Sequence, residues 1–274
     1  MEASLAREKA SLRSQSGTGG SRAPAFGSLA SLGISAAAIL VGLAVWELVW
    51  REHWVASYSL PGPRDVAREW WLLSQHGILW HHTYATVREA ALGFLAAFVV
   101  AIVVGYPLAK SHVLASVLSP YVAATQAMPI IALAPVLIVW FGLGLASKTL
   151  ICAIIVFFPM LVTVAVGIRN VDRTLVEAAA TEGAGRWRTF RYVEFPLALR
   201  TILAGVRMGL TLAMTGAIVA EFVAASSGLG YAMEYARSLY NAPMLFAYSL
   251  TMVGLAVAAY IFVGLLEHVL IDWD

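Results

Sequence analysis

The sequence predicts an all-α integral membrane protein with six transmembrane helices. Charged residues make up only 12% of its 274 residues, and 60% are hydrophobic. A typical soluble domain carries about 25% charged residues. The mean hydropathy is high, at +0.79, and apolar runs recur at lengths that can cross a bilayer core of about 30 Å. The net charge of +2 comes from basic residues gathered in loops, which does not indicate nucleic-acid binding.

The N-terminal segment, residues 1–27, is rich in Ser, Gly, Ala and Arg and shows no apolar periodicity. We therefore expect a disordered tail. The apolar run over residues 28–50 predicts the first transmembrane helix. Four Lys and Arg residues precede that run. Because basic flanks are retained in the cytoplasm, the N-terminus is expected to be cytoplasmic.

The segment 51–87 is mixed in composition and is expected to lie outside the membrane on the external side. It contains a turn at residues 60–63 and then an amphipathic stretch over residues 64–74. Trp70 and Trp71 lie in this stretch, and aromatic residues of this kind favour the membrane interface. An interfacial helix is therefore predicted before the core of the protein.

Residues 88–270 are expected to form a core of five further spans. These spans are predicted at residues 88–109, 117–143, 149–168, 201–224 and 246–270. Six spans place the loop 169–200 and the C-terminus in the cytoplasm with the N-terminus. The loop holds six arginines, which favours this orientation, while Lys148 falls in an external loop.

Small residues recur every four positions in two of the predicted spans. The two runs are Gly93, Ala97, Ala101, Gly105 and Ala109, and then Gly205, Gly209, Ala213 and Ala217. Small side chains at this spacing let helix backbones approach closely within lipid. We therefore expect both runs to be helix-packing faces.

The loop 169–200 is expected to be folded into two short helices. Asp172 can cap the first helix by accepting free N–H groups of its first turn. Gly183 can end that helix in a left-handed conformation. A second helix is expected from about residue 185 to 194, limited by Pro196, because proline disfavours helix in the residue before it.

The same loop carries a motif. Glu177, Ala178 and Ala179 are followed by Gly183 and then by Val193-Glu194-Phe195-Pro196. The spacing resembles the EAA loop of ABC importer permeases, with Val and Phe where that pattern has Ile and Leu. The resemblance implies a type I importer fold in which this loop is a coupling helix that docks on an ATPase subunit. It assigns ATPase coupling to Glu177, Ala178, Ala179, Gly183, Arg186 and Pro196.

Further stretches resemble the nitrate, sulfonate and taurine group of these permeases. They are Gln126-Ala127-Met128-Pro129, the segments 132–135 and 140–144, and Glu221 with Gly228-Leu229-Gly230. The resemblance implies a homodimeric permease in the cell membrane, with two ATPase subunits and an extracytoplasmic binding protein. Substrates in that group include nitrate, sulfonates, taurine, and pyrimidine or flavin precursors.

A substrate pathway is expected along the third and fifth spans. Gln126 lies mid-span, where an amide without a partner in lipid would cost several kcal/mol. Met128 and Pro129 follow it, and the proline breaks the third span. Met214 and Thr215 lie just beside the small-residue run of the fifth span. Each of these residues is a candidate for lining a central cavity.

Glu221 continues the small-residue run of the fifth span at its outer end. A carboxylate there faces protein or water more often than lipid. Two roles are open: contact with substrate, or capping of the glycine-rich segment 226–230, and the second is slightly favoured.

The chain carries no recognisable phosphate-binding loop, catalytic triad or metal-ligand spacing. His81 and His82 are adjacent, so on a helix they diverge by about 100° and make a poor metal pair. We therefore expect a permease without its own ATPase site, catalytic residue, metal or cofactor. An ion-coupled secondary transporter and a non-transport membrane component are the alternatives.

Overall fold

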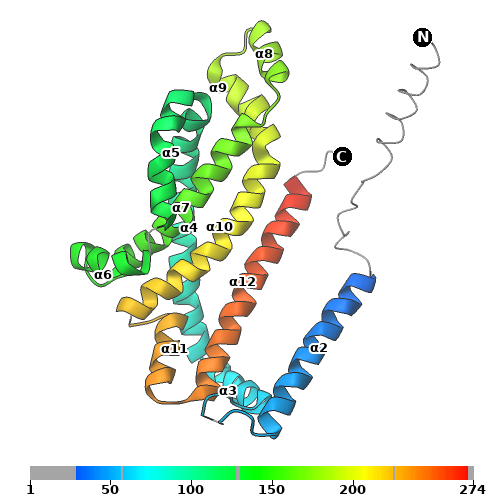
Figure 1. Cartoon of the computed structure of the whole chain (residues 1–274), viewed down its shortest axis with the longest axis vertical. Coiled ribbons are helices and arrows are strands. Elements are labelled where there is room, and N and C mark those ends of the chain that lie inside the picture. Colours follow the sequence, from blue (N-terminus) through cyan, green and yellow to red (C-terminus); the bar gives the residue numbers. More distant parts are fainter. Residues whose placement is uncertain (1–28, 57, 128–129, 225, 271–274) are drawn as a thin grey trace, which may run out of the picture. The chain divides into compact units, whose positions relative to one another are not determined.

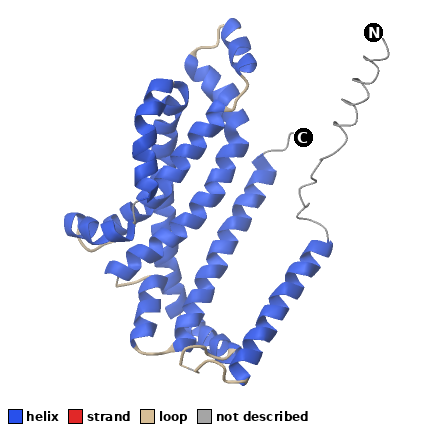
Figure 2. Ribbon diagram, in the orientation of Figure 1, coloured by secondary structure: helices blue, strands red, loops and turns tan. Residues whose placement is uncertain are grey.

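A computed structural model describes residues 29–56, 58–127, 130–224 and 226–270, and in these ranges it consists of helices joined by loops, with no strand (Figure 2). The tail expected over residues 1–27 lies outside the described residues. The helices are α2 (Leu29–Arg51), α3 (Pro63–Gln75), α4 (Ile78–Lys110), α5 (His112–Ala127), α6 (Ile130–Phe141), α7 (Leu145–Arg169), α8 (Arg173–Thr181), α9 (Arg186–Thr189), a π-helix (Phe190–Glu194), α10 (Phe195–Ala224), α11 (Leu229–Ser238) and α12 (Ala242–Leu270).

The chain divides into two units, residues 1–54 and 55–274. The first contributes α2, a 23-residue apolar helix. In the second unit, four helices are long and apolar enough to cross a membrane: α4, α7, the continuous run Arg186–Val223 and Ala242–Glu267 of α12. The expected all-α membrane architecture is therefore confirmed, whereas the orientation of the termini stays a prediction.

The third expected span, residues 117–143, is not one continuous helix. Its place is taken by α5 and α6, of 16 and 12 residues. At 1.5 Å per residue they are about 24 and 18 Å long, shorter than a bilayer core. Figure 1 shows α6 turning away from the axis of α5. The sequence places Pro129 between them, and proline has no N–H group for a helical hydrogen bond.

Helix α7 is the centre of the core. Its Ile151, Cys152, Val156 and Met160 are fully buried. Helices α4 and α10 pack against it on two sides (Figure 1). Helix α12 packs against α10, α11 and α3, where Trp70 Nε1 donates a hydrogen bond to Thr251 Oγ1 at 3.0 Å.

The small-residue runs form these interfaces, as the sequence predicted. A Cβ atom added to Gly93 of α4 would lie 2.3 Å from Cys152 Cβ, and one added to Gly205 of α10 would lie 2.5 Å from Thr163 Cγ2. Heavy atoms cannot approach so closely, so only glycine permits the observed separation of these helices from α7.

Candidate functional site

The loop between α7 and α10 forms a foot, defined here as residues 172–194. Asp172 caps α8, because its Oδ1 accepts hydrogen bonds from Thr174 N at 2.9 Å and Thr174 Oγ1 at 2.6 Å. Both hydrogen bonds stabilise the ionised carboxylate and lower the pKa of Asp172. The predicted cap is therefore present.

Gly183 turns the chain between α8 and α9. Its φ is +82°, in the left-handed region that favours glycine. Ala184 N donates to Ala179 O at 3.0 Å across the turn. Glu177, Ala178 and Arg186 are exposed and Ala179 is half-buried, so the residues of the motif lie on the surface of a folded element.

The expectation that Pro196 ends the second helix is wrong. Helix continues from α9 through the π-helix into α10, and Pro196 is the second residue of α10. In the π-helix, Phe195 N donates to Phe190 O, a wider turn than in an α-helix. Pro196 lacks a backbone N–H group, and its ring needs space in the preceding turn. The wider hydrogen-bonded turn of the π-helix accommodates both. The foot is thus directly continuous with a transmembrane helix.

The base of the foot is tied to α4. Glu194 is 2% exposed and forms an ion pair with Lys110 at the end of α4. The rings of Phe190 and Tyr106 meet edge to face, with centroids 4.7 Å apart. The other side of the foot is uncovered, because Leu175 is 48% and Trp187 70% exposed. A rigid base and an exposed apolar tip suit an element that docks on another protein.

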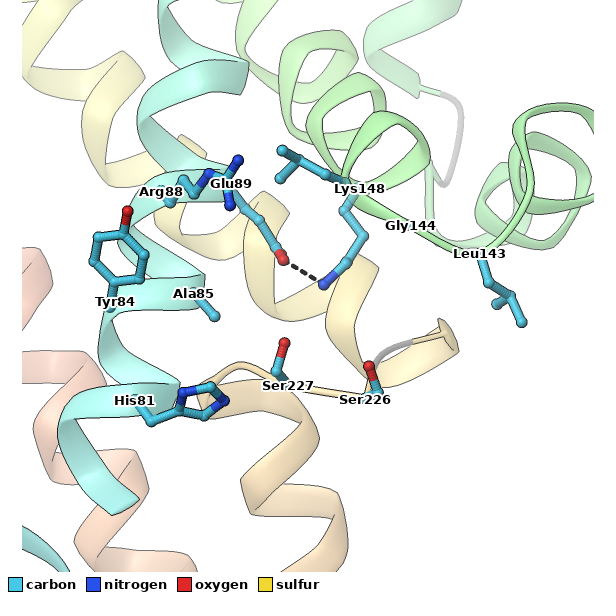
Figure 3. A pocket seen from close by; sticks show the side chains of 11 residues that line it. His81, Tyr84, Ala85, Arg88, Glu89, Leu143, Gly144, Lys148, Ser226 and Ser227 are labelled. Atoms are coloured by element: carbon cyan, nitrogen blue, oxygen red, sulfur yellow. Dashed lines mark hydrogen bonds and ion pairs between the residues drawn. The ribbon is translucent and has the colours of Figure 1, made fainter. Parts of the chain in front are cut away.

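A buried polar cluster lies at the opposite end of the same helices. Glu89 of α4 and Lys148 of α7 are 3% and 7% exposed and form an ion pair (Figure 3). Lys148 belongs to α7, which begins at Leu145, so it lies within a helix and not in a loop before it, whereas its expected place on the external side stays a prediction. Lys148 can be buried between the packed helices because the carboxylate of Glu89 on α4 neutralises its charge.

Glu221 of α10 holds the start of α11 within this cluster. Its Oε2 accepts from Gly230 N at 2.5 Å, and its Oε1 accepts from Thr86 Oγ1 at 2.7 Å. Thr86 Oγ1 in turn accepts from Leu229 N at 2.8 Å. The favoured capping role of Glu221 is therefore observed, since free N–H groups at the start of α11 are bound by side chains from α4 and α10.

His82 and Gly228 complete this anchor. His82 Nδ1 accepts from Gly228 N at 3.1 Å. Gly228 has a φ of +117°, and a Cβ added to it would lie 2.1 Å from Glu221 Cδ. Its backbone thus leaves no room for another side chain. In the described part of the chain, no three His, Cys, Asp or Glu residues could hold a metal ion together.

A pocket of about 670 Å³ opens beside the cluster (Figure 3). Helix α4, the start of α7 and the segment before α11 line it. The lining residues are His81, Tyr84, Ala85, Arg88, Glu89, Leu143, Gly144, Leu145, Lys148, Ser226 and Ser227.

The structure leaves the expected substrate pathway of the third and fifth spans a prediction. Met128, Pro129 and the side chain of Gln126 fall outside the described residues. Met214 is 8% exposed and packs within the chain, whereas Thr215 is exposed on α10. Neither lines the pocket, so a role in a pathway stays a prediction for both.

Sequence reasoning missed Thr86, Glu89 and Lys148. A signal was present, because Glu89 lies four residues before Gly93 and so continues the packing run of α4. Glu221 continues the run of α10 in the same way. These positions indicate that both carboxylates lie on packing faces, whereas the partner of Glu89 follows only from the packing of α4 against α7.

Residues 93–271 match the model of a protein family described as the binding-protein-dependent transport system inner membrane component. This chain belongs to that family. It is 42% identical to the riboflavin transport system permease protein RibX of Chloroflexus aurantiacus, over 89% of this chain and 91% of the relative. It is 32% identical to the putative aliphatic sulfonates transport permease protein SsuC of Escherichia coli, over 85% of this chain and 88% of the relative. It is 29% identical to the taurine transport system permease protein TauC of the same organism, over 83% of this chain and 82% of the relative.

A solved structure of the MetNI methionine ABC transporter shares the fold. The TM-score is 0.64 at 20% identity, over 73% of this chain and 96% of the matched chain. The protein is therefore an ABC transporter permease, a multi-pass inner-membrane subunit of the type I importer fold. Permeases of this family carry no ATPase site of their own, and ATP is hydrolysed by a partner subunit.

Proposed function

We propose that this chain is the permease subunit of an ATP-driven importer, with the foot as the contact for the ATPase. The observation that supports this most directly is the foot itself. It is capped by Asp172, turned at Gly183 and exposed at Trp187, yet its base is held to α4 by the Lys110–Glu194 ion pair. A movement of the foot caused by the ATPase would therefore be transmitted directly to α4 and α10, because no flexible loop separates the foot from these helices.

The proposed assembly contains two copies of this chain, two ATPase subunits and an extracytoplasmic binding protein. The resemblance of the foot to the EAA loop supports this composition. The family is described as binding-protein-dependent, which supports delivery of the solute by a separate protein. Coupling then follows from the continuity of α9, the π-helix and α10, which joins the docking surface to a transmembrane helix in one element.

The proposed solute is of the flavin type. Identity to the riboflavin permease is 42%, against 32% and 29% for the sulfonate and taurine permeases, over similar shares of the chain. Nitrate-like anions, sulfonates and taurine are the alternative solutes.

Reconstitution tests the proposal. Proteoliposomes holding the permease, its ATPase and its binding protein should accumulate riboflavin only when ATP is supplied to the ATPase side. Liposomes with the permease alone should not accumulate it. Accumulation without the ATPase would instead indicate a secondary transporter, and absence of flux for riboflavin, taurine and an alkanesulfonate would indicate a non-transport component.

A further inference from the structure

The pocket beside the buried cluster has the dimensions of a small-molecule site. Its volume is about 670 Å³, and ligand pockets commonly span about 300–1,000 Å³. It lies at the end of α4 and α7 that is remote from the foot, which contacts α4 at Lys110. Tyr84 and Ser226 at its rim are exposed, so a solute could enter from that side.

The floor of the pocket holds a charged group with spare hydrogen-bonding capacity. Lys148 has three N–H groups, and among the described residues its recorded hydrogen bond goes to Glu89 Oε1. Glu89 Oε2 has no donor within the same part of the chain. A buried ion pair is often no more stabilising than an apolar pair of the same shape. The rest of this packing face is apolar, and an ion pair is not needed there for stability. The Glu89–Lys148 pair therefore fits a role in binding.

One wall of the pocket is a single face of α4. His81 and Arg88 lie on this wall, whereas Figure 3 shows the ring of Tyr84 on the other side of α4 from Lys148 and Ser227. An imidazole and a guanidinium each offer a flat surface on which a planar ring can stack. Arg88 also carries N–H donors at the edge of this wall.

The opposite wall is polar and fixed in place. Ser226 and Ser227 contribute hydroxyl groups. The segment that follows them is anchored, because Gly228 N donates to His82 and Gly230 N donates to Glu221. A wall held in this way is pre-organised for a ligand, which reduces the ordering cost of binding.

The charge of Lys148 at the floor of the pocket is matched by Glu89, its ion-pair partner. Arg88 is then the remaining cation among the lining residues. A sulfonate or nitrate would need a surplus of positive charge close to it. A neutral ring with carbonyl oxygens needs only N–H and O–H donors beside an aromatic surface, which is what the pocket supplies.

We propose that this pocket is a solute-binding vestibule for the planar, carbonyl-bearing ring of a flavin-type solute. The ring stacks on His81, and its carbonyl oxygens accept hydrogen bonds from Arg88, Lys148 and the serine hydroxyls. Glu89 acts through Lys148, whose ammonium it orients. This inference rests on the proposed function, whose solute it places at specific residues.

Thiol protection tests the location of the site. Ser226→Cys is introduced in a Cys152→Ala background, and the permease–ATPase complex in proteoliposomes is treated with a water-soluble thiol reagent. Riboflavin should slow labelling at position 226 at least threefold, whereas taurine should not. Ser238→Cys, exposed on α11 outside the pocket, is the matched control, and its labelling should be unchanged by either solute.

Filling the pocket gives a second measurement. Ser226→Trp should reduce ATP-dependent riboflavin uptake at least tenfold in a complex that still assembles with the ATPase, and Ser238→Trp should transport like wild type. If the wild-type complex transports riboflavin but position 226 is unprotected and Ser226→Trp is fully active, the vestibule is refuted while the proposed function stands. Protection by taurine alone would refute the neutral-ring argument. If the wild-type complex does not transport riboflavin, the proposed solute and this inference fail together.

Discussion

The Glu89–Lys148 pair provides a quantitative test of the core. Both side chains are almost fully buried, on helices that pack through glycine and alanine. Replacing Lys148 with Met leaves the Glu89 carboxylate without its cation in a low-dielectric interior. Removing one partner of a buried pair typically destabilises a protein by about 3–5 kcal/mol. Lys148→Met should therefore destabilise the permease by roughly that amount.

The double variant Glu89→Leu/Lys148→Met should recover most of this loss. It removes both charges, and the side chains that replace them are apolar and of similar length. Substitution of a whole buried pair by apolar residues is often neutral or stabilising. The interaction between the two sites should therefore be large and favourable in a double-mutant cycle.

Thermal unfolding of the purified permease–ATPase complex in detergent measures the effect. At about 2–4 °C per kcal/mol, a loss of 3 kcal/mol lowers the apparent midpoint by roughly 6–12 °C at a fixed scan rate. Glu234→Gln is the matched control. It breaks the Glu234–Arg237 pair, whose side chains are 44% and 67% exposed, and should leave the midpoint unchanged.

Two outcomes would refute this reasoning. If Lys148→Met melts like wild type, Glu89 is not held in an environment that needs a cation. If the double variant melts as low as Lys148→Met, the loss comes from altered packing and not from an unpaired charge.

Four further predictions follow from the foot and the packing faces. Gly183→Val should leave membrane insertion normal but strongly reduce uptake and solute-stimulated ATPase activity, because its φ is +82°; wild-type coupling would contradict it. Gly209→Leu should lower the unfolding midpoint of the complex, because an added Cβ already meets side chains at 3.1 Å; an unchanged midpoint would place that face against lipid. Gly228→Ala should abolish the anchor of α11 and increase proteolysis near it, because its Cβ would collide with Glu221; a wild-type digestion pattern would refute the anchor. The protection factors of the amides in the first turn of α8, which correct exchange rates for their intrinsic pH dependence, should be constant from pH 7 to 5 and fall only as pH falls through the lowered pKa of Asp172, since the ionised carboxylate is the stabilising form; a loss of protection near pH 6 would rule that out.

Local signals in the sequence were sufficient for much of this structure. The cap at Asp172 and the turn at Gly183 depend on one side chain and one backbone conformation, and both are observed. The packing faces of α4 and α10 follow from four-residue periodicity, which is a property of a single helix. Such features require no knowledge of which helices are neighbours.

The buried cluster could not be read in the same way. Glu89 and Lys148 are separated by 59 residues in sequence, and each looks like the polar end of a span when its own helix is considered alone. Their burial depends on a partner that only the packing of α4 against α7 provides. Pro196 shows the same limit of sequence-based prediction. A proline favours the end of a helix just before it, but here a π-helix precedes it and the helix continues.

The central claim, that the foot is the docking surface for the ATPase, can be tested by the accessibility of one position. Trp187 is 70% exposed in the permease. Trp187→Cys, in a Cys152→Ala background, should react readily with a water-soluble thiol reagent in the isolated permease and become protected when the ATPase is added. Tyr240→Cys, at a site that is 87% exposed and remote from the foot, should react equally in both preparations. Equal reactivity of position 187 with and without the ATPase would contradict the account.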